Sequence, residues 1–592
     1  MSAEARAEAA EARVAALETE NAELQAMVAK LTAQLGVVGD APSAASPEPE
    51  EAEPPTAKDE GAEAREAMLN YWESQSGGDG MLGPTVEAMM LDEGAAKIDQ
   101  AERPEILGML PPLEGMDMIE MGAGIGRLTG ELATRAKTVL ACDFVDVSIK
   151  ANEAAHSHLG NCEFLCADAT KMDRPAGSLD IVFSNWLLMY FTDAEVDELF
   201  AKALRWLRPG GYLFFRESCF HQSGNAKRNE NPTEYRSPGQ YHQMATDQLQ
   251  LLTPDGPPAS PSRRVKQQLQ SGGGCYVFEL VTQKALQSYI ELKGNHNQIA
   301  WLFQKRETTF TRAPTRGAVI QTFLDSQRYT TEAIRIYERM YGEGYVSCGG
   351  ADTTTELVTS LALQPGERVL DVGCGIGGGW QQNAYDYQVK VVGVDLSVNM
   401  INLALDRRVR VAKHQDVEQR KLCDVSFEVA DIMEREFDDA SFDVIYARDS
   451  LLHIDDKEAL FGRLFRWLKP GGRLLLSDYV VADPKDVPQL SAEFSGYISS
   501  RSYSLLDTAK YSSTIAAAGF SDLAVEDRTE QMVTCLNKEL SAIREPATAE
   551  AFERDFGAGD LQQLTDGWEG KLKWAADGEF KWAVIRATKP KE

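Results

Sequence analysis

The chain has few of the features that mark a nucleic-acid-binding protein or a metalloprotein. Its 60 basic residues are outnumbered by 91 acidic ones, which gives a formal net charge of −31 at pH 7. Such a surface repels a phosphate backbone, so no binding of nucleic acid is expected, although a small phosphorylated ligand needs only local positive charge. The nine cysteines include no CxxC pair. The spacing of Cys and His therefore predicts neither a disulfide framework nor a metal site.

The sequence also lacks a membrane anchor and a targeting segment. No apolar run reaches the roughly 18 residues that a membrane-spanning helix needs. The N-terminus is acidic and has no apolar stretch of the kind that signal peptides carry. Scattered, unpaired thiols are typical of a reducing compartment, so we expect a cytoplasmic protein. At 592 residues, with 43% hydrophobic and 26% charged residues, the chain is too long for one core and should form several domains.

Residues 1–36 show the pattern of a coiled-coil helix. Apolar side chains recur at spacings of three and four, with one asparagine at an a position. The positions are Val14, Leu17, Asn21, Leu24, Val28, Leu31 and Leu35. A buried pair of Asn21 amides would favour a parallel homodimer through residues 10–36, but three heptads are marginal, and a solvated single helix is the alternative. Residues 37–65 are rich in Pro, Ala and Glu, which predicts a disordered linker.

Five segments recur in the same order about 250 residues apart. The first copy reads MIEMGAGIGRLTG, LACDFVD, CEFLCADAT, SLDIVFSNWLLMYF and LRWLRPGGYLFFRE. The second reads VLDVGCGIGGG, VGVDLSVNM, VSFEVADIM, SFDVIYARDSLLHI and FRWLKPGGRLLLSD. Apolar runs alternate with helical patterns in both copies, which predicts an α/β fold with parallel strands and helices on both faces. We expect two doubly wound, Rossmann-like domains, at 66–305 and 318–592, joined by a connector at 306–317.

A glycine-rich turn follows the first strand of each copy, at Gly122 and Gly373. Glycine permits a tight turn and close approach of a ligand, but the second copy also fits G-x-G-x-x-G, so a nicotinamide cofactor has to be considered. Carboxylates after the second and third strands favour a different ligand. One is placed to accept both ribose hydroxyls and the other to accept the adenine amino group. They are Asp143 and Asp168 in the first copy, and Asp395 and Asp431 in the second. With the Pro-Gly-Gly corner that follows, this is the pattern of class I S-adenosylmethionine-dependent methyltransferases.

Beyond this pattern, nearly the whole globular length resembles the plant-type, two-module phosphoethanolamine N-methyltransferases. The strings that carry the resemblance are FSNWLLMYF, FFRESCFHQSGNAKRNENPTEYR, YERMYGEGYVSCGG, DVGCGIGGG, GVDLSVNMI and DVIYARDSLLHI. The resemblance implies three methyl transfers from S-adenosylmethionine, which convert phosphoethanolamine to phosphocholine and release S-adenosylhomocysteine. It assigns the first transfer to the first domain and the later two to the second. The expected partners are phosphoethanolamine and its mono- and dimethyl forms, with no metal required.

The resemblance also implies roles for individual residues. His453 is the expected catalytic residue, and Tyr329 is expected to close over the donor and hydrogen-bond His453. Donor contacts carry over to Gly122, Arg127, Asp143, Asp168, Ala169 and Asn185 in the first domain, and to Ser347, Gly373, Asp395, Leu396, Asp431, Ile432 and Arg448 in the second. Phosphobase contacts carry over to Ser218, Ser223, Gly224, Arg228 and Tyr235, and to Tyr337, Asp449, Tyr479, Tyr497, Arg501, Tyr503 and Lys571.

The chemistry gives these residue types a purpose. An alkyl ammonium with a pKa like that of lysine is only ~0.1% deprotonated near neutral pH, a deficit of roughly 4 kcal/mol that a base or desolvation must offset. Fixed cations and hydroxyls suit the phosphate, and tyrosine faces suit a methylated ammonium. One position departs from the family pattern: Arg328 stands where the family usually has glutamine. In the first domain Tyr190 stands where the second domain has His453, so no base is predicted there.

Two other interpretations stay open from the sequence. A tandem methyltransferase could act on another small amine, such as glycine, and would then be indifferent to a substrate phosphate. Alternatively, one domain could bind the donor without turnover and serve as a scaffold.

Overall fold

The computed structural model describes residues 65, 67–73, 85–90, 94–221, 233–251, 275–308, 320–321, 323–412, 416 and 424–591. The predicted helix at 1–36 and the linker at 37–65, apart from Arg65, lie outside these residues. So do three of the predicted phosphobase contacts, Ser223, Gly224 and Arg228. Within the described residues no helix is both long and apolar enough to cross a membrane.

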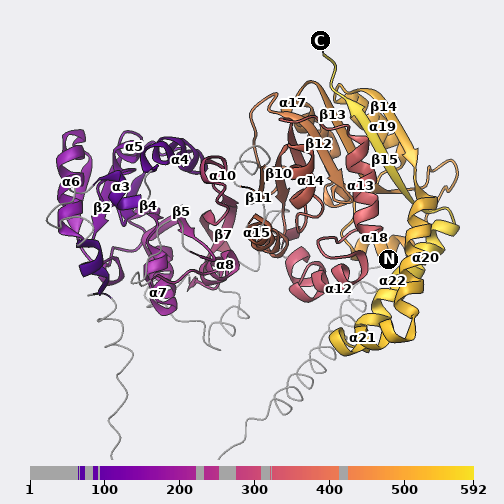
Figure 1. The fold of residues 1–592 in the computed structure, drawn as a ribbon, viewed down its shortest axis with the longest axis horizontal. Coiled ribbons are helices and arrows are strands. Elements are labelled where there is room, and N and C mark those ends of the chain that lie inside the picture. Colours follow the sequence, from indigo (N-terminus) through magenta and orange to yellow (C-terminus); the bar gives the residue numbers. More distant parts are fainter. Residues whose placement is uncertain are drawn as a thin grey trace, which may run out of the picture. The chain divides into compact units, whose positions relative to one another are not determined.

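The first domain is built on a twisted sheet with the strand order β7-β8-β5-β4-β1-β2-β3 (Figure 1). Its strands are β1 (Asp117–Met121), β2 (Thr138–Asp143), β3 (Cys162–Cys166), β4 (Leu179–Asn185), β5 (Leu207–Ser218), β6 (Leu249–Leu251), β7 (Cys275–Ala285) and β8 (Gln298–Thr308). Strands β1 to β5 pair in parallel, as the alternation of strand and helix patterns predicted.

The second domain repeats this order as β14-β15-β13-β12-β9-β10-β11. Its strands are β9 (Arg368–Val372), β10 (Lys390–Asp395), β11 (Val425–Val429), β12 (Phe442–Arg448), β13 (Leu468–Val481), β14 (Ser521–Asp527) and β15 (Phe580–Thr588). β9 to β13 pair in parallel. The shared order confirms the prediction of two Rossmann-like domains.

The sheets differ from the prediction in their last strands. β8 and β7 pair antiparallel beyond β5, and β15 and β14 pair antiparallel beyond β13. Long segments separate β5 from β8 and β13 from β15, so each of these strands can enter the sheet in the opposite direction. β11 also pairs antiparallel with β7, so one sheet contains strands of both domains, which the repeat alone did not predict.

Helices pack against the sheet of each domain (Figure 1). Those of the first domain are α3 (Val86–Met90), α4 (Ala95–Met109), α5 (Thr129–Ala133), α6 (Asp146–His156), α7 (Asp193–Trp206), α8 (Pro238–Thr246) and α10 (Gln287–Lys293). Those of the second are α12 (Thr331–Tyr341), α13 (Gly350–Ser360), α14 (Trp380–Tyr387), α15 (Val398–Ala412), α17 (Lys457–Trp467), α18 (Ala492–Ser500), α19 (Thr508–Ala517), α20 (Thr529–Arg544), α21 (Pro546–Phe556) and α22 (Ala558–Ala576). Short turns of helix occur at η1 (Ser157–Leu159), η2 (Ala169–Lys171), η3 (Leu188–Tyr190), η4 (Leu324–Arg328) and η5 (Leu451–His453).

Helix α7 shows how local sequence produces these elements. Thr192 accepts a hydrogen bond from the Glu195 backbone, and the Glu195 side chain accepts one from the Thr192 backbone, which satisfies N–H groups at the helix start. The buried side chains then recur at helical spacing, so one face of α7 packs on the sheet. They are Val196, Leu199, Phe200, Ala203, Leu204 and Trp206.

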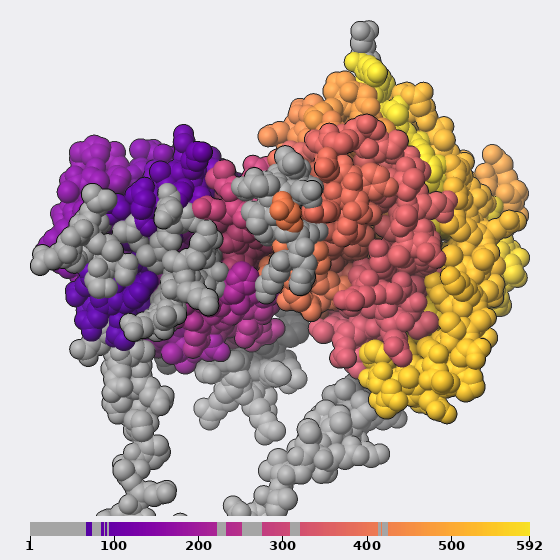
Figure 2. Space-filling view, viewed as in Figure 1, coloured from indigo at the N-terminus to yellow at the C-terminus, as the bar shows by residue number. Residues whose placement is uncertain are grey.

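The C-terminal helices of the second domain pack against the segment that precedes its first strand. Figure 2 shows the yellow C-terminal segment lying directly against the red segment that contains α12 and α13. A backbone hydrogen bond from Gly349 to the Glu539 carboxylate on α20 joins the two, at 2.9 Å. The N-terminal and C-terminal ends of this domain therefore meet beside its glycine-rich turn.

Candidate active sites

The glycine-rich turn of each domain is held by a carboxylate at the end of the neighbouring strand. The Asp395 carboxylate accepts hydrogen bonds from the backbone of Gly375 and of Ser397, both at 2.8 Å. In the first domain Asp143 accepts equivalent bonds from Gly124 at 2.8 Å and from Val145 at 2.9 Å. Both domains therefore position this carboxylate in the same way, as the repeated sequence predicted.

Burial raises the pKa values of these two carboxylates. It raises the pKa of Asp395 to about 6, against the opposing effect of the Ser397 and Gly375 N–H groups, and the nearby Asp325 carboxylate raises it further. Burial raises the pKa of Asp143 as well. A ligand that donates hydroxyl groups to either carboxylate stabilises its ionised form.

Gly373 is required by its close packing on Ser450 and by its backbone conformation. Its φ is +74°, and a Cβ atom there would lie 2.2 Å from the Cβ of Ser450. An alanine at this position would therefore clash with Ser450, and its backbone conformation would be strained. A second carboxylate in each domain follows the third strand and also accepts a backbone hydrogen bond. Asp431 accepts a bond from the Met433 backbone at 2.9 Å, and Asp168 accepts one from Thr170 at 3.0 Å.

One cavity brings together most of the residues predicted for the second domain. Its lining includes Tyr329, Tyr337, Ser347, Gly373, Asp395, Leu396, Asp431, Ile432, Arg448, Asp449, His453, Tyr479, Tyr503 and Lys571. Tyr497 and Arg501 do not line it. They stand behind Tyr503, with the Tyr497 ring 6.0 Å from the Tyr503 ring and the Arg501 guanidinium 5.2 Å from the Tyr497 ring centre.

His453 lies on the η5 turn that follows β12, with its imidazole close to the Ser502 carbonyl. The distance from Nδ1 to this oxygen is 3.3 Å, and a carbonyl can only accept, so Nδ1 carries the proton and Nε2 has a free lone pair. Burial lowers the pKa of His453 to about 4, while the bond to Ser502 acts in the opposite direction. The imidazole is therefore neutral at physiological pH and able to accept a proton.

The structure does not contain the predicted hydrogen bond between Tyr329 and His453. The Tyr329 ring packs against Tyr337, with ring centres 6.4 Å apart, and Asn399 holds the Tyr329 carbonyl at 2.9 Å. The ring that meets His453 edge-on is that of Tyr503, at 5.2 Å. The backbone of Tyr329 is thus fixed by the start of α15, and its ring lies among tyrosines.

Asp449 occupies a strained backbone position beside this imidazole. Its φ is +51°, which non-glycine residues rarely adopt. Oδ1 accepts bonds from the Trp582 indole and the Ser477 hydroxyl, both at 2.8 Å. Sequence reasoning missed Trp582, because this residue reaches the site only through the antiparallel pairing of β15 with β13.

Three cations stand next to tyrosines on the acceptor side of the second domain. Arg328 donates to the Tyr337 hydroxyl at 2.9 Å, and the Lys571 ammonium lies 3.3 Å from the Tyr479 hydroxyl. Arg501, stacked on Tyr497, is the third. Arg328 ends the π-helical turn η4, one residue before Tyr329. Cations of this kind with several hydroxyls form a suitable binding site for a phosphate.

In the first domain a second cavity collects every predicted residue that the structure describes. These are Gly122, Arg127, Asp143, Asp168, Ala169, Asn185, Ser218 and Tyr235. Arg127 is already paired there: it donates to Asp99 at 2.9 Å and forms an ion pair with Glu102. Its guanidinium thus contributes to an internal network as well as to the cavity wall.

Tyr190 occupies the first-domain position that His453 has in the second. It lies on η3, and its ring meets the Trp72 ring edge-on at 5.8 Å. Trp72, in the helical residues 67–73, also lines the cavity and was not predicted, because it lies far upstream of the glycine-rich turn in sequence. No imidazole takes this position in the first domain.

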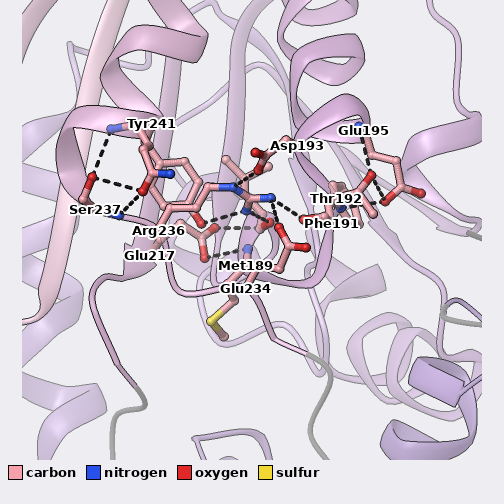
Figure 3. A network of polar contacts seen from close by, with 12 residues as sticks. Met189, Phe191, Thr192, Asp193, Glu195, Glu217, Glu234, Arg236, Ser237 and Tyr241 are labelled. Carbon is pink, nitrogen blue, oxygen red and sulfur yellow. Dashed lines mark hydrogen bonds and ion pairs between the residues drawn. The ribbon is translucent and has the colours of Figure 1, made fainter.

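A buried arginine, next to Tyr235 in sequence, joins the η3 turn to this segment by hydrogen bonds (Figure 3). Arg236 donates to the carbonyls of Leu188 at 3.0 Å and Phe191 at 2.6 Å. It also pairs with Asp193 and Glu234, both at 2.7 Å. The position of Tyr190 therefore depends on Arg236.

Comparisons with known proteins agree with this duplicated geometry. A family model described as a methyltransferase domain matches residues 119–215, and another with the same description matches residues 349–524. Phosphoethanolamine N-methyltransferase 3 of Arabidopsis thaliana is 45% identical over 89% of this chain and 98% of its own length. Phosphoethanolamine N-methyltransferase of Triticum aestivum is 44% identical over 89% of this chain and 96% of its own length.

A solved structure is similar along most of the chain. It is Haemonchus contortus phosphoethanolamine N-methyltransferase 2 in complex with phosphomonomethylethanolamine and S-adenosylhomocysteine. The TM-score is 0.62 and the sequence identity 26%, over 83% of this chain and 99% of that one.

Proposed function

This chain belongs to the phosphoethanolamine N-methyltransferase family, and from that premise we propose that it makes phosphocholine from phosphoethanolamine by three successive methyl transfers. The observation that carries the proposal is the duplicated site, in which each domain has a glycine-rich turn held by a strand-end carboxylate. The first domain performs the first transfer, and the second performs the later two.

Each donor site is suited to S-adenosylmethionine, which supplies a methyl group on a positively charged sulfur. Asp395 and Asp143 offer carboxylate oxygens to ribose hydroxyls, and Asp431 and Asp168 offer theirs to the adenine amino group. Gly373 lines the cavity, and its close packing on Ser450 fixes the turn against which the donor lies. Arg448 holds the wall of this site, since it donates to the Cys348 and Gly350 carbonyls at 2.7 and 3.1 Å.

In the second domain, His453 takes the proton of the substrate ammonium through Nε2. The neutral imidazole is in the correct state to accept it. A phosphate dianion bound nearby favours the imidazolium and strengthens this base. Asp449 attracts the cationic amine, and the rings of Tyr503 and Tyr479 stabilise it increasingly as methyl groups replace its hydrogen bonds, by about 0.5–2 kcal/mol. Tyr329 and Tyr337 exclude water from the amine.

The phosphate is bound by Lys571 and Arg328, which line the cavity, with the hydroxyls of neighbouring tyrosines. Arg501 supports this site from behind Tyr503, through its stacking on Tyr497. This cluster of cations favours a phosphobase over an amine such as glycine, which has no dianion for them to bind. The matching carboxylates in both domains likewise favour two working donor sites over a scaffold with one silent domain.

The first domain binds phosphoethanolamine between Ser218, Tyr235 and the Trp72–Tyr190 pair. Ser223, Gly224 and Arg228, which lie outside the described residues, stay a prediction of the family resemblance for this substrate. Because Tyr190 replaces the histidine, deprotonation of the amine there relies on desolvation by the aromatic wall.

The test is mass spectrometry of the products formed from phosphoethanolamine and S-adenosylmethionine by the intact protein and by the His453→Ala variant. We expect phosphocholine from the intact protein and accumulation of phosphomonomethylethanolamine from the variant. A variant that still makes phosphocholine at the normal rate would exclude His453 as the base. Absence of any methylated product from the intact protein would refute the substrate assignment.

We place the enzyme in the cytoplasm and propose that it dimerises through residues 10–36. The unpaired thiols favour a reducing compartment, and the heptad pattern with Asn21 favours a parallel pair of helices. Sedimentation of the full chain and of a variant lacking residues 1–60 tests the second point. The same oligomeric state with and without residues 1–60 would contradict dimerisation through this helix.

A further inference from the structure

Two thiols meet beside the donor site of the second domain. Cys348 lines the cavity in the turn before α13, and Cys535 lies on α20. The two thiols are electrostatic neighbours, each affecting the ionisation of the other. Cys535 also packs against the turn itself, since its Sγ lies 3.1 Å from the place that a Cβ on Gly349 would take.

Glu539 holds this turn against α20. It follows Cys535 by one helical turn, so both side chains lie on the same face of the helix. Its Oε1 accepts a bond from the Gly349 backbone at 2.9 Å and lies 3.5 Å from the Cys348 sulfur. Both thiols therefore lie at the same fixed turn, Cys348 within it and Cys535 packed against Gly349.

The same turn is part of the donor site. The Cys348 carbonyl accepts a bond from Arg448 at 2.7 Å, and Arg448 also holds the Gly350 carbonyl at 3.1 Å. Ser347 and Cys348 both line the cavity. A covalent change at Cys348 therefore alters the position of Arg448 and the shape of the donor site.

The surroundings give the two thiols different chemical roles. The neighbouring Cys348 thiol lowers the pKa of Cys535 against the effect of burial, helped by the Thr353 hydroxyl and the charges of Lys538 and Arg448. The Cys535 thiol, burial and Glu539 raise the pKa of Cys348. Cys535 is thus the thiolate that a peroxide oxidises, and Cys348 keeps its proton.

We propose that Cys348 and Cys535 form a reversible disulfide when the enzyme meets a hydroperoxide, and that this bond switches off the second methyltransferase site. The Cys535 thiolate attacks one oxygen of the peroxide and becomes a sulfenic acid. When the oxidant is hydrogen peroxide, the O–O bond breaks and hydroxide is the leaving group. The Cys348 sulfur then displaces the hydroxyl from Cys535, and the Cys348 proton leaves with that hydroxyl as water. Two thiols are oxidised and one peroxide is reduced. A dithiol reductant restores both thiols.

The inference rests on the proposed function only for the identity of the product that accumulates. With the second domain switched off, the enzyme should stop at phosphomonomethylethanolamine. Methylation of phosphoethanolamine by the first domain should continue.

The experiment exposes the reduced, full-length protein to hydrogen peroxide, alkylates the remaining thiols and maps disulfide-linked peptides by mass spectrometry. We expect one peptide pair joining Cys348 to Cys535, lost after dithiothreitol treatment. Conversion of phosphomonomethylethanolamine should fall and recover in parallel. The matched controls are Cys535→Ser, which should resist peroxide with its initial activity intact, and Cys166→Ser, which should respond like the wild type. Cys166 is an exposed residue, but partial burial of its thiol and the nearby carboxylates raise the pKa of that thiol, so it should react slowly with peroxide.

Each outcome separates this inference from the proposed function. Both thiols alkylated after peroxide treatment would overturn the disulfide, whatever the activity. A mapped disulfide with unchanged methylation would overturn the switch. A mapped disulfide in a protein that methylates no phosphobase before oxidation would refute the proposed function and leave the disulfide standing. If Cys535→Ser loses activity before oxidation, Cys535→Ala provides the same test.

Discussion

At the scale of single residues, the two carboxylates that we propose for donor binding also stabilise the local fold. Asp395 and Asp143 each accept two backbone N–H groups, which fixes the glycine-rich turn without any ligand. The same oxygens are the groups that ribose hydroxyls would reach. Burial makes ionisation of these carboxylates costly, so donor binding and deprotonation are linked.

Donor affinity of the second domain should fall as the pH is lowered through about 6, the pKa to which burial raises Asp395. Ribose hydroxyls donate to the ionised carboxylate, so the ionised form binds more tightly. Well below the pKa, affinity should fall about tenfold per pH unit. Calorimetric titration with S-adenosylhomocysteine from pH 5 to 8, in an Asp143→Ala background, isolates this site.

The matched control is Asp395→Asn, added to the same background. This variant should bind weakly and without the dependence on pH. A flat affinity between pH 5 and 7 in the parent would show that Asp395 does not ionise on binding.

Arg328 should be responsible for phosphate affinity in the second domain. Arg328→Gln removes a cation that donates to Tyr337, so the Michaelis constant for phosphomonomethylethanolamine should rise about tenfold, as for the loss of a charge-assisted hydrogen bond. The turnover number should change less, because the arginine does not contact the amine. A lower Michaelis constant in the variant would instead show that Arg328 obstructs the pocket.

At the scale of elements, the two short turns after β4 and β12 determine how the domains differ. η5 presents His453, whereas η3 presents Tyr190. The sequence repeat was sufficient to align them, since both follow a buried strand of the same length. What holds η3 in place was not visible in the repeat, because Arg236 lies in a segment between β5 and α8 that the second domain does not match.

Replacing Arg236 by methionine should destabilise the first domain and abolish the first methylation. The Arg236 side chain is 3% exposed, and its loss leaves the Leu188 and Phe191 carbonyls without their donor, at a cost of about 2–4 kcal/mol. Thermal unfolding and conversion of phosphoethanolamine measure both effects. Conversion of phosphomonomethylethanolamine by the second domain should persist.

Lys150→Met provides a control for loss of a cation in the same domain. Its ion pair with Asp146 is solvent-exposed and screened by water, so the change should leave the unfolding temperature nearly unchanged. Equal destabilisation by the two variants would show that the hydrogen bonds and ion pairs of Arg236 add no more stability than an exposed ion pair does.

At the scale of the whole molecule, the duplicated sites predict separable activities. Asp143→Ala should make no product from phosphoethanolamine but should still convert phosphomonomethylethanolamine to phosphocholine. Asp395→Ala should accumulate phosphomonomethylethanolamine. Product analysis by mass spectrometry distinguishes these patterns, and a mixture of the two variants should restore phosphocholine, because each domain has its own donor carboxylate. If neither substitution altered any step, the two-site interpretation would be wrong.

The repeat, the glycine-rich turns and the strand-end acids were sufficient to predict two Rossmann-like domains, and they indicated the carboxylates that we propose for donor binding. These features are local: a buried strand, a turn that needs glycine and the residue at the strand end are contiguous in sequence. The family resemblance extended the prediction to the acceptor residues, and the cavities contain most of those that the structure describes.

Other features depended on contacts between distant segments, which only the tertiary structure determined. The antiparallel pairing of β15 with β13 brings Trp582 to Asp449, and the packing of α20 on the turn before α13 brings Cys535 to Cys348. The placement of Trp72 over Tyr190 has the same origin. The sequence by itself therefore determined the repeated donor site, because its parts are local. The surroundings of the reacting groups were decided by the tertiary structure, because non-local packing determines which side chains are buried together and hence their pKa values.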